Sequence, residues 1–180
     1  DSFVSRGLGD VYKRQISGVH DLLPNRVGGA ALQKNLETLG DIQYTQEEMD
    51  FALELQRNNG KPEIGIDGKI RPLRETLSSP GGGSTDSGDV SYNVPVVSLA
   101  ATTAPKGVPW HSWSVVASSG MSIGHKGMLH AAKALGMTMV DIFKDSKLRE
   151  NIKKEFDEKI GEYEYDPYLD PGPPPIDYVD

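Results

Sequence analysis

Two polar stretches of this sequence contain residue types that could do chemistry. Residues 81–91, GGGSTDSGDVS, place a glycine run before several hydroxyl side chains and before Asp86 and Asp89. Residues 109–113, PWHSW, place His111 between two tryptophans. A glycine run lets the backbone approach a ligand closely, and a neutral imidazole is the commonest metal ligand in proteins. The two stretches together predict a site that binds a metal ion or a polar ligand.

A single histidine more often has a structural role than a ligating one, but the surroundings of His111 favour a functional interpretation. Pro109 stiffens the loop, and the flanking tryptophans offer an apolar wall that would limit water access. We therefore expect a shielded His111 that ligates a metal or acts in catalysis, with a structural role as the alternative. His125 and His130 are interpreted as surface or structural residues, and His20 lies in the first apolar run of the chain.

The two aspartates admit two interpretations. They lie three residues apart after the glycines, so at least one of them is expected to cap a short helix. In the functional alternative, a carboxylate orients a ligating histidine or a substrate group. The stretch also has the glycines of a phosphate loop, but it lacks the lysine and the spacing of a Walker sequence. A non-catalytic module that binds an anion through residues 81–88 therefore stays open as an alternative function.

The elements that must position these stretches are mainly helices. Apolar residues recur at helical spacing from Val27 to Leu39, before Gly40. A capping box at residues 45–48 opens a second helix that stops at residues 58–60. Ser122 can cap a third helix, and Asp145 or Ser146 a fourth. The apolar stripe of the third helix is predicted to be core: Met128, Ala132, Leu135, Met139 and Ile142.

Two apolar runs, residues 16–23 and 96–101, are expected to form strands. Because α/β enzymes hold polar loops at the ends of buried strands, the second run would deliver the His111 loop. Two strands cannot cover the apolar faces of four helices. We therefore expect further strands of the same sheet to lie outside this sequence.

The composition excludes several classes of function. The chain has 180 residues, of which 37% are hydrophobic, and a net charge of −7, so we expect a single globular domain and no nucleic-acid or anionic-membrane partner. No cysteine is present, which excludes disulfides and thiolate metal sites. No apolar run reaches the roughly 20 residues of a membrane span. A soluble cytoplasmic protein is the expectation.

The two ends of the sequence differ from the rest. Residues 10–15, DVYKRQ, match the translation of a transposon end used in preparing sequencing libraries, so residues 1–15 are expected to be an artefact without ordered structure. Residues 165–180 are rich in proline and acidic residues, which predicts an extended tail.

Three motifs in this order resemble the C-terminal part of the p-aminobenzoyl-glutamate hydrolase-like amidohydrolases. They are residues 83–91, residues 109–113 and residues 123–129, IGHKGML. This family is a branch of the dinuclear metallopeptidases that include aminoacylases and carboxypeptidase G. The similarity extends from about residue 18 to about residue 175, and the combination of motifs is specific where any single one would not be.

The resemblance implies an α/β fold, namely part of an αβα-sandwich catalytic domain of the zinc-peptidase type that is interrupted by a dimerisation lid. Residues 16–24 would be the last strand of the lid, and residues 25–164 the C-terminal half of the catalytic domain. Residues 165–180 would be a tail. The N-terminal half and the rest of the lid would lie outside this sequence.

The resemblance also implies a site. His111 matches the last metal ligand of the family, whereas the other ligands and the general-base glutamate would come from the missing half, so no catalytic residue is expected in this chain. Residues 84–86 match the site loop of the family. The residues expected to contact substrate or to support the ligands are Gly82, Gly83, Ser84, Thr85, Asp86 and Asp89.

The implied cofactors are two divalent ions, Zn²⁺ or Mn²⁺, which activate a water molecule for attack on an amide carbonyl. The implied substrate is a small N-acyl or N-aroyl amino acid similar to aminobenzoyl-glutamate. The complete protein would dimerise through the lid, with itself or with a paralogous subunit. The 180-residue chain alone is expected to be inactive.

Deleting residues 1–15 should leave the fold unchanged, because this segment has no apolar pattern able to dock on a core. We expect the free energy of unfolding to change by less than about 0.5 kcal/mol in urea denaturation. A larger loss would show that the segment packs natively.

Overall fold

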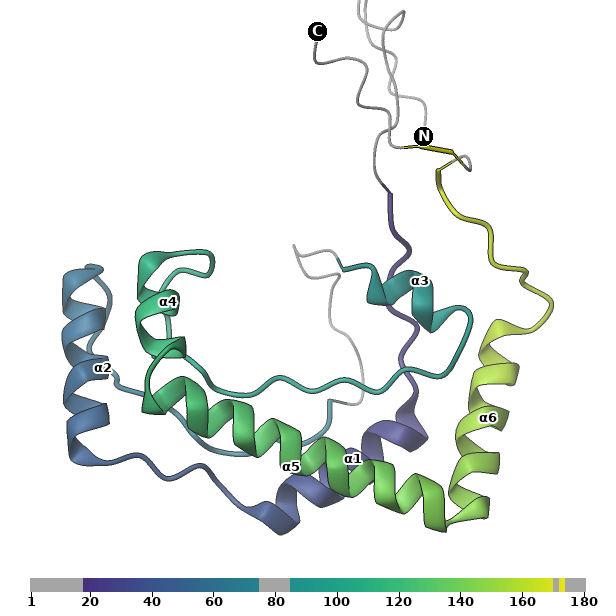
Figure 1. Ribbon diagram of the computed structural model, residues 1–180, viewed down its shortest axis with the longest axis horizontal. Coiled ribbons are helices and arrows are strands. Elements are labelled where there is room, and N and C mark those ends of the chain that lie inside the picture. Colours follow the sequence, from purple (N-terminus) through teal and green to yellow (C-terminus); the bar gives the residue numbers. More distant parts are fainter. Residues whose placement is uncertain (1–17, 75–84, 170–171, 174–180) are drawn as a thin grey trace, which may run out of the picture.

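A computed structural model of the chain describes residues 18–74, 85–169 and 172–173. The described residues form helices joined by long extended segments (Figure 1). In Figure 1 the longest helix, α5, connects a group formed by α2 and α4 to a group formed by α1 and α6. The helices are α1 (Arg26–Leu39), α2 (Gln46–Asn58), α3 (Ser87–Ser91), α4 (Trp113–Ser119), α5 (Ser122–Lys144) and α6 (Ser146–Ile160).

The helix boundaries follow the capping residues of the sequence. The capping box that opens α2 is complete, because the Thr45 side chain accepts from the Glu48 amide and Glu48 accepts from the Thr45 amide. The Asp145 side chain caps α6 by accepting from the Leu148 amide at 3.0 Å. The predicted helices are therefore confirmed. Two details differ: Met121, and not Ser122, is the N-cap of α5, and α4 was not predicted.

The two predicted strands are not formed as regular strands in the described part of the chain. Their one ladder contact is an isolated parallel bridge between Pro24 and Val96. Residues 96–101 are extended but half-buried or exposed, whereas a buried strand was predicted. A strand is held by hydrogen bonds to neighbouring strands, and a single bridge leaves most of its backbone groups without them. The αβα-sandwich architecture stays a prediction.

Extended residues 96–104 pack closely on two helices through glycines. A Cβ at Gly127 of α5 would lie 2.2 Å from the carbonyl oxygen of Thr102, and a Cβ at Gly28 of α1 would lie 2.4 Å from the Val97 side chain. Real side chains cannot approach that closely. Gly127 therefore lets the backbone of the segment lie directly against α5, and Gly28 makes room for the Val97 side chain against α1.

Beyond Ile123, the buried side of α5 is a stripe of small residues, so the predicted core stripe is wrong. Met128, Leu135 and Met139 are 58%, 40% and 57% exposed, respectively. The buried positions include Gly127, Ala134 and Thr138, and α1 packs on this helix. Hydrophobicity patterns give weight to large side chains, and they therefore selected the wrong side of the helix. No helix of the described residues is long and apolar enough to cross a membrane.

A buried apolar cluster joins α2 to α5. Ala52, Ile66 and Ile123 form it, and partly buried Tyr44, Met49 and Phe51 pack against it. Next to the cluster, the Nζ atom of Lys126 lies 2.6 Å from a carboxylate oxygen of buried Glu48. Burial alone would raise the pKa of Glu48, but hydrogen bonds from Lys126, Ser122 and the Thr45 amide outweigh it and lower the pKa from 4.5 to about 2. The ion pair therefore ties α2 to α5 at neutral pH.

The Glu48 ion pair should make the stability of the chain depend on acid pH. Because the folded-state pKa is depressed, its contribution is fully present above about pH 5 and is lost as the pH falls from about 4.5 towards 2. We expect Glu48→Gln to lower the free energy of unfolding by about 2 kcal/mol at pH 7 and by little at pH 2. Urea denaturation at both pH values measures this, with the exposed neighbour Glu47→Gln as control. A loss independent of pH would contradict the assignment.

Candidate functional site

The loop with the two aspartates leads into the short helix α3. Thr85 and Asp86 are exposed, and the Thr85 carbonyl oxygen accepts from the Gly88 amide at 3.1 Å. Asp86 occupies the N-cap position, but its side chain accepts no cap hydrogen bond and Asp89 lies within the helix, so the capping expected of one of the two aspartates is not formed. The Asp86 carboxylate therefore stays at the surface. The remaining predicted loop residues, Gly82, Gly83 and Ser84, lie outside the described residues.

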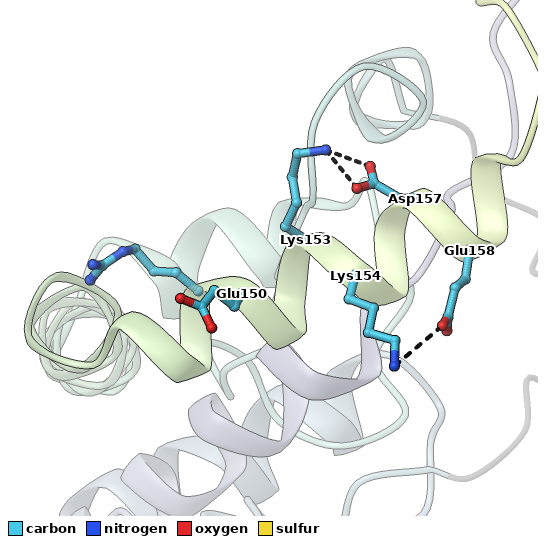
Figure 2. Close-up of a pocket in the computed structure, with 6 residues that line it drawn as sticks. Glu150, Lys153, Lys154, Asp157 and Glu158 are labelled. Carbon is cyan, nitrogen blue, oxygen red and sulfur yellow. Dashed lines mark hydrogen bonds and ion pairs between the residues drawn. The ribbon is translucent and has the colours of Figure 1, made fainter.

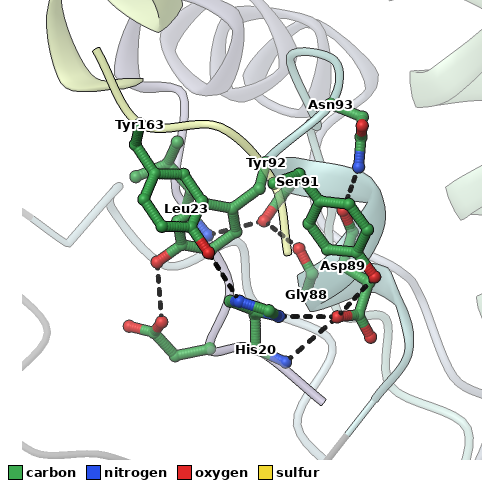
Figure 3. Close-up of polar contacts among 10 residues, drawn as sticks. His20, Leu23, Gly88, Asp89, Ser91, Tyr92, Asn93 and Tyr163 are labelled. Carbon is green, nitrogen blue, oxygen red and sulfur yellow. Dashed lines mark hydrogen bonds and ion pairs between the residues drawn. The ribbon is translucent and has the colours of Figure 1, made fainter. Parts of the chain in front are cut away.

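Asp89 binds a different histidine from the one expected to ligate a metal (Figure 3). Its Oδ1 atom lies 2.8 Å from Nδ1 of His20 and 3.3 Å from the His20 backbone nitrogen. Hydrogen bonds from the His20 ring and backbone hold the pKa of Asp89 below its ordinary value. Asp89 is therefore a carboxylate that orients a histidine, although this histidine is not His111.

His20 is buried among tyrosines from the end of the chain. Its Nε2 atom lies 2.8 Å from the hydroxyl of Tyr163, and the Tyr168 ring stacks on it with centroids 4.2 Å apart. The hydroxyl of Tyr165 donates to Oδ1 of Asp89 at 3.2 Å. Both ring nitrogens of His20 thus have partners within the chain. Neither the role of His20 nor its tyrosine partners were predicted, because contacts across more than 140 positions leave no local sequence signal.

His111 lies in a tight turn before α4. It is exposed, and with φ of 59° it is the one residue other than glycine with positive φ in the part of the chain that the structure describes. Trp110 and Trp113 are 72% and 58% exposed, so the predicted apolar wall around the imidazole is not formed. The left-handed conformation is uncommon for a residue with a Cβ, and strained residues cluster at functional sites.

The structure does not bring His111 and the aspartates together. In Figure 1, α3 and the turn before α4 lie apart, connected by the long segment that follows α3. The described residues contain no group of three or more His, Asp or Glu side chains that could hold a metal ion. His111 and Asp86 are thus exposed single groups, and Asp89 is paired elsewhere.

A cleft of about 830 Å³ lies along this connecting segment. Its walls are formed mainly by α1, residues 67–74 and residues 96–108, and Trp110 also lines it. The segment ends beside buried Gln56, whose amide makes four hydrogen bonds of 2.8–2.9 Å. They join the side chain to the backbones of Ile64, Gly65 and Lys106. Lys106 lies five residues before His111. Gln56 therefore anchors the chain that leads to the His111 turn.

A second hollow lies on α6 and carries no chemistry of its own. Lys153 pairs with Asp157 at 2.6 Å and Lys154 with Glu158 at 3.7 Å, and all four side chains are more than half exposed (Figure 2). Such exposed pairs at i,i+4 spacing contribute only a few tenths of a kcal/mol. This face of α6 is therefore a solvated one.

Comparison with known proteins relates the chain to a bacterial hydrolase. The chain is 34% identical, over 157 residues, to one subunit of p-aminobenzoyl-glutamate hydrolase from Escherichia coli (strain K12). The match covers 74% of this chain but 33% of that protein, so the chain spans about a third of the length of this relative. No family profile matches the chain. No solved structure matches it either.

Replacing Gln56 should destabilise the fold, because leucine would leave the backbone groups of residues 64, 65 and 106 without their buried partner. We expect Gln56→Leu to lower the free energy of unfolding by about 2–4 kcal/mol, measured by urea denaturation. Gln46→Leu, at the exposed start of the same helix, is the control and should change it by less than about 0.5 kcal/mol. Equal effects of the two substitutions would contradict the anchoring role.

Proposed function

We propose that this chain is the C-terminal part of an amidohydrolase that cleaves the amide bond of an N-acyl or N-aroyl amino acid. The observation that carries the proposal is the 34% identity to one subunit of p-aminobenzoyl-glutamate hydrolase. The resemblance of the stretches around Asp86, His111 and residues 123–129 to motifs of the family also supports it. An aminobenzoyl-glutamate-like compound is therefore the first substrate to test.

His111 is the residue of this chain that we propose as a metal ligand. Its exposed imidazole, on a turn with positive φ, offers a nitrogen donor without competing partners among the described residues. One donor does not make a metal site, and the described residues supply no group of three donors. The described residues therefore do not supply enough ligands to hold the expected pair of Zn²⁺ or Mn²⁺ ions. The remaining ligands and the general-base glutamate of the proposed enzyme would have to come from a longer protein.

Thr85 and Asp86 are the groups that we propose for contact with the substrate. Both are exposed, and the Asp86 carboxylate is not used in capping α3. An exposed carboxylate and hydroxyl can accept from and donate to the amide of an N-acyl amino acid. We also propose that the complete protein assembles as a dimer or with a paralogous partner, because the relative is named as one subunit of its enzyme.

In a longer protein that restores the upstream segment, His111→Ala should lower the metal content and abolish most hydrolysis of aminobenzoyl-glutamate. Removal of one of a few ligands weakens an ion strongly, because no spare donor replaces it. Metal analysis and glutamate release measure the two effects, with His130→Ala on α5 as the matched control. Equal metal content and turnover in wild type and His111→Ala would refute the site assignment.

The 180-residue chain alone should release no glutamate, because its described residues lack a complete set of ligands. Metal-dependent turnover by the purified chain would contradict the proposal. A longer protein without metal or activity that binds inorganic phosphate would instead support the anion-binding alternative.

A further inference from the structure

The proposed function does not use the most completely bonded histidine of the described chain. His20 is 7% exposed, and its ring lies between Asp89 on one side and Tyr163 on the other. No metal ligand group includes it among the described residues. Its bonds instead connect three distant parts of the sequence: the segment before α1, helix α3 and the segment after α6 (Figure 3).

The segment before α1 fixes α3 through contacts that leave little freedom. The His20 ring and backbone nitrogens both contact Oδ1 of Asp89, and the Leu23 amide donates to the hydroxyl of buried Ser91 at 2.8 Å. Between them, a Cβ at Gly88 would lie 1.9 Å from the carbonyl oxygen of His20, so only glycine allows this approach. A five-residue helix has too few internal hydrogen bonds to hold its own orientation. These contacts must therefore set it.

The segment after α6 contacts His20 and Asp89 through three tyrosines. Tyr163 contacts the ring nitrogen that Asp89 leaves open, and Tyr168 covers the ring face. Tyr165 donates to the same Asp89 oxygen that His20 contacts. The imidazole is thus bonded at both nitrogens and stacked, which fixes its rotamer and the position of the Asp89 carboxylate.

We propose that His20 is a positioning residue of the site, which acts through Asp89 to hold α3 and so presents Thr85 and Asp86 to the substrate. This inference rests on the proposed function and goes beyond it, because it assigns different roles to the two aspartates. Oδ1 of Asp89 is bonded to His20 and Tyr165, whereas Asp86 is exposed at the start of the same helix. The segment 163–168, rich in tyrosine, then supports the site from the far end of the chain.

Two substitutions of His20 test the contacts of its two ring nitrogens separately. The side-chain amide of asparagine places a donor near Nδ1, so His20→Asn keeps the bond to Asp89 and loses the bond to Tyr163. The longer glutamine places its amide near Nε2, so His20→Gln keeps the bond to Tyr163 and loses the side-chain bond to Asp89, while the 3.3 Å contact of the backbone nitrogen of residue 20 remains. Tyr163→Phe removes the hydroxyl alone. Tyr44→Phe is the matched control, because its hydroxyl makes one long contact of 3.5 Å to Thr102, away from the cluster.

Hydrogen exchange of the 180-residue chain tests the positioning without any assay of activity. We expect the amides of residues 88–94 to exchange about tenfold faster in His20→Gln than in wild type, and less than about threefold faster in His20→Asn. Tyr163→Phe should give an intermediate increase, and Tyr44→Phe none in this region. Unchanged exchange in both His20→Gln and Tyr163→Phe would overturn the proposal. If His20→Gln does not fold, Tyr163→Phe decides alone.

Kinetics of the longer protein test whether the positioning serves the reaction. We expect His20→Gln to lower kcat for aminobenzoyl-glutamate by about 10- to 100-fold with unchanged metal content, and His20→Asn to restore most of it. If His20 had a purely structural role, both variants would lower the amount of folded enzyme, and their kcat values would not differ. Equal kcat values per folded enzyme would therefore overturn the role in catalysis. If wild type shows no turnover, the proposed function fails, while the exchange result still decides whether His20 positions α3.

Discussion

The close approach of residues 96–104 to the helix backbones is the constraint on which the rest of the described structure depends. This segment carries the chain from α3 to the His111 turn, and it lies against α5 and α1 where Gly127 and Gly28 leave room. A Cβ at either glycine would clash with the segment, at Gly127 with its backbone and at Gly28 with the Val97 side chain, so the two glycines set the distance of the segment from both helices. The candidate groups before and after the segment are positioned by this packing.

Buried polar groups, and not a large apolar core, then fix the ends of the segments. Gln56 bonds the backbone at Lys106, and Asn25 caps α1 while it donates to the Ile152 carbonyl of α6. Glu155 accepts from the first two amides of α1 at 2.7–2.8 Å, where a negative charge is favourable. Satisfied polar groups of this kind specify one arrangement, because any other would leave them unpaired in a buried place.

The helices could be predicted from the sequence because their causes are local. The Thr45 capping box and the Asp145 cap lie within four residues of the amides that they serve. The strand at residues 96–101 could not be predicted correctly, because a strand depends on neighbours that the local pattern does not contain. The prediction of the buried side of α5 was wrong for a related reason. Small residues such as Gly127 and Ala134 decide which side is buried, yet they contribute little to a hydrophobic pattern.

In the candidate site, too, the residue types could be predicted from the local sequence, whereas their distant partners could not. The sequence pointed to Asp86, Asp89 and His111 as polar groups in suggestive places, but it could not say which of them is already occupied. The structure distinguishes them by their partners: Asp89 is bonded to His20 and Tyr165, whereas Asp86 and His111 face outward. An oxygen that already accepts three hydrogen bonds, as Oδ1 of Asp89 does, cannot also bind a ligand without breaking one of them, which is costly in a partly buried place. Asp86 and His111, which lie apart, are therefore the candidate groups of this chain whose side chains are exposed to a ligand. Asp89 holds the helix that begins next to Asp86.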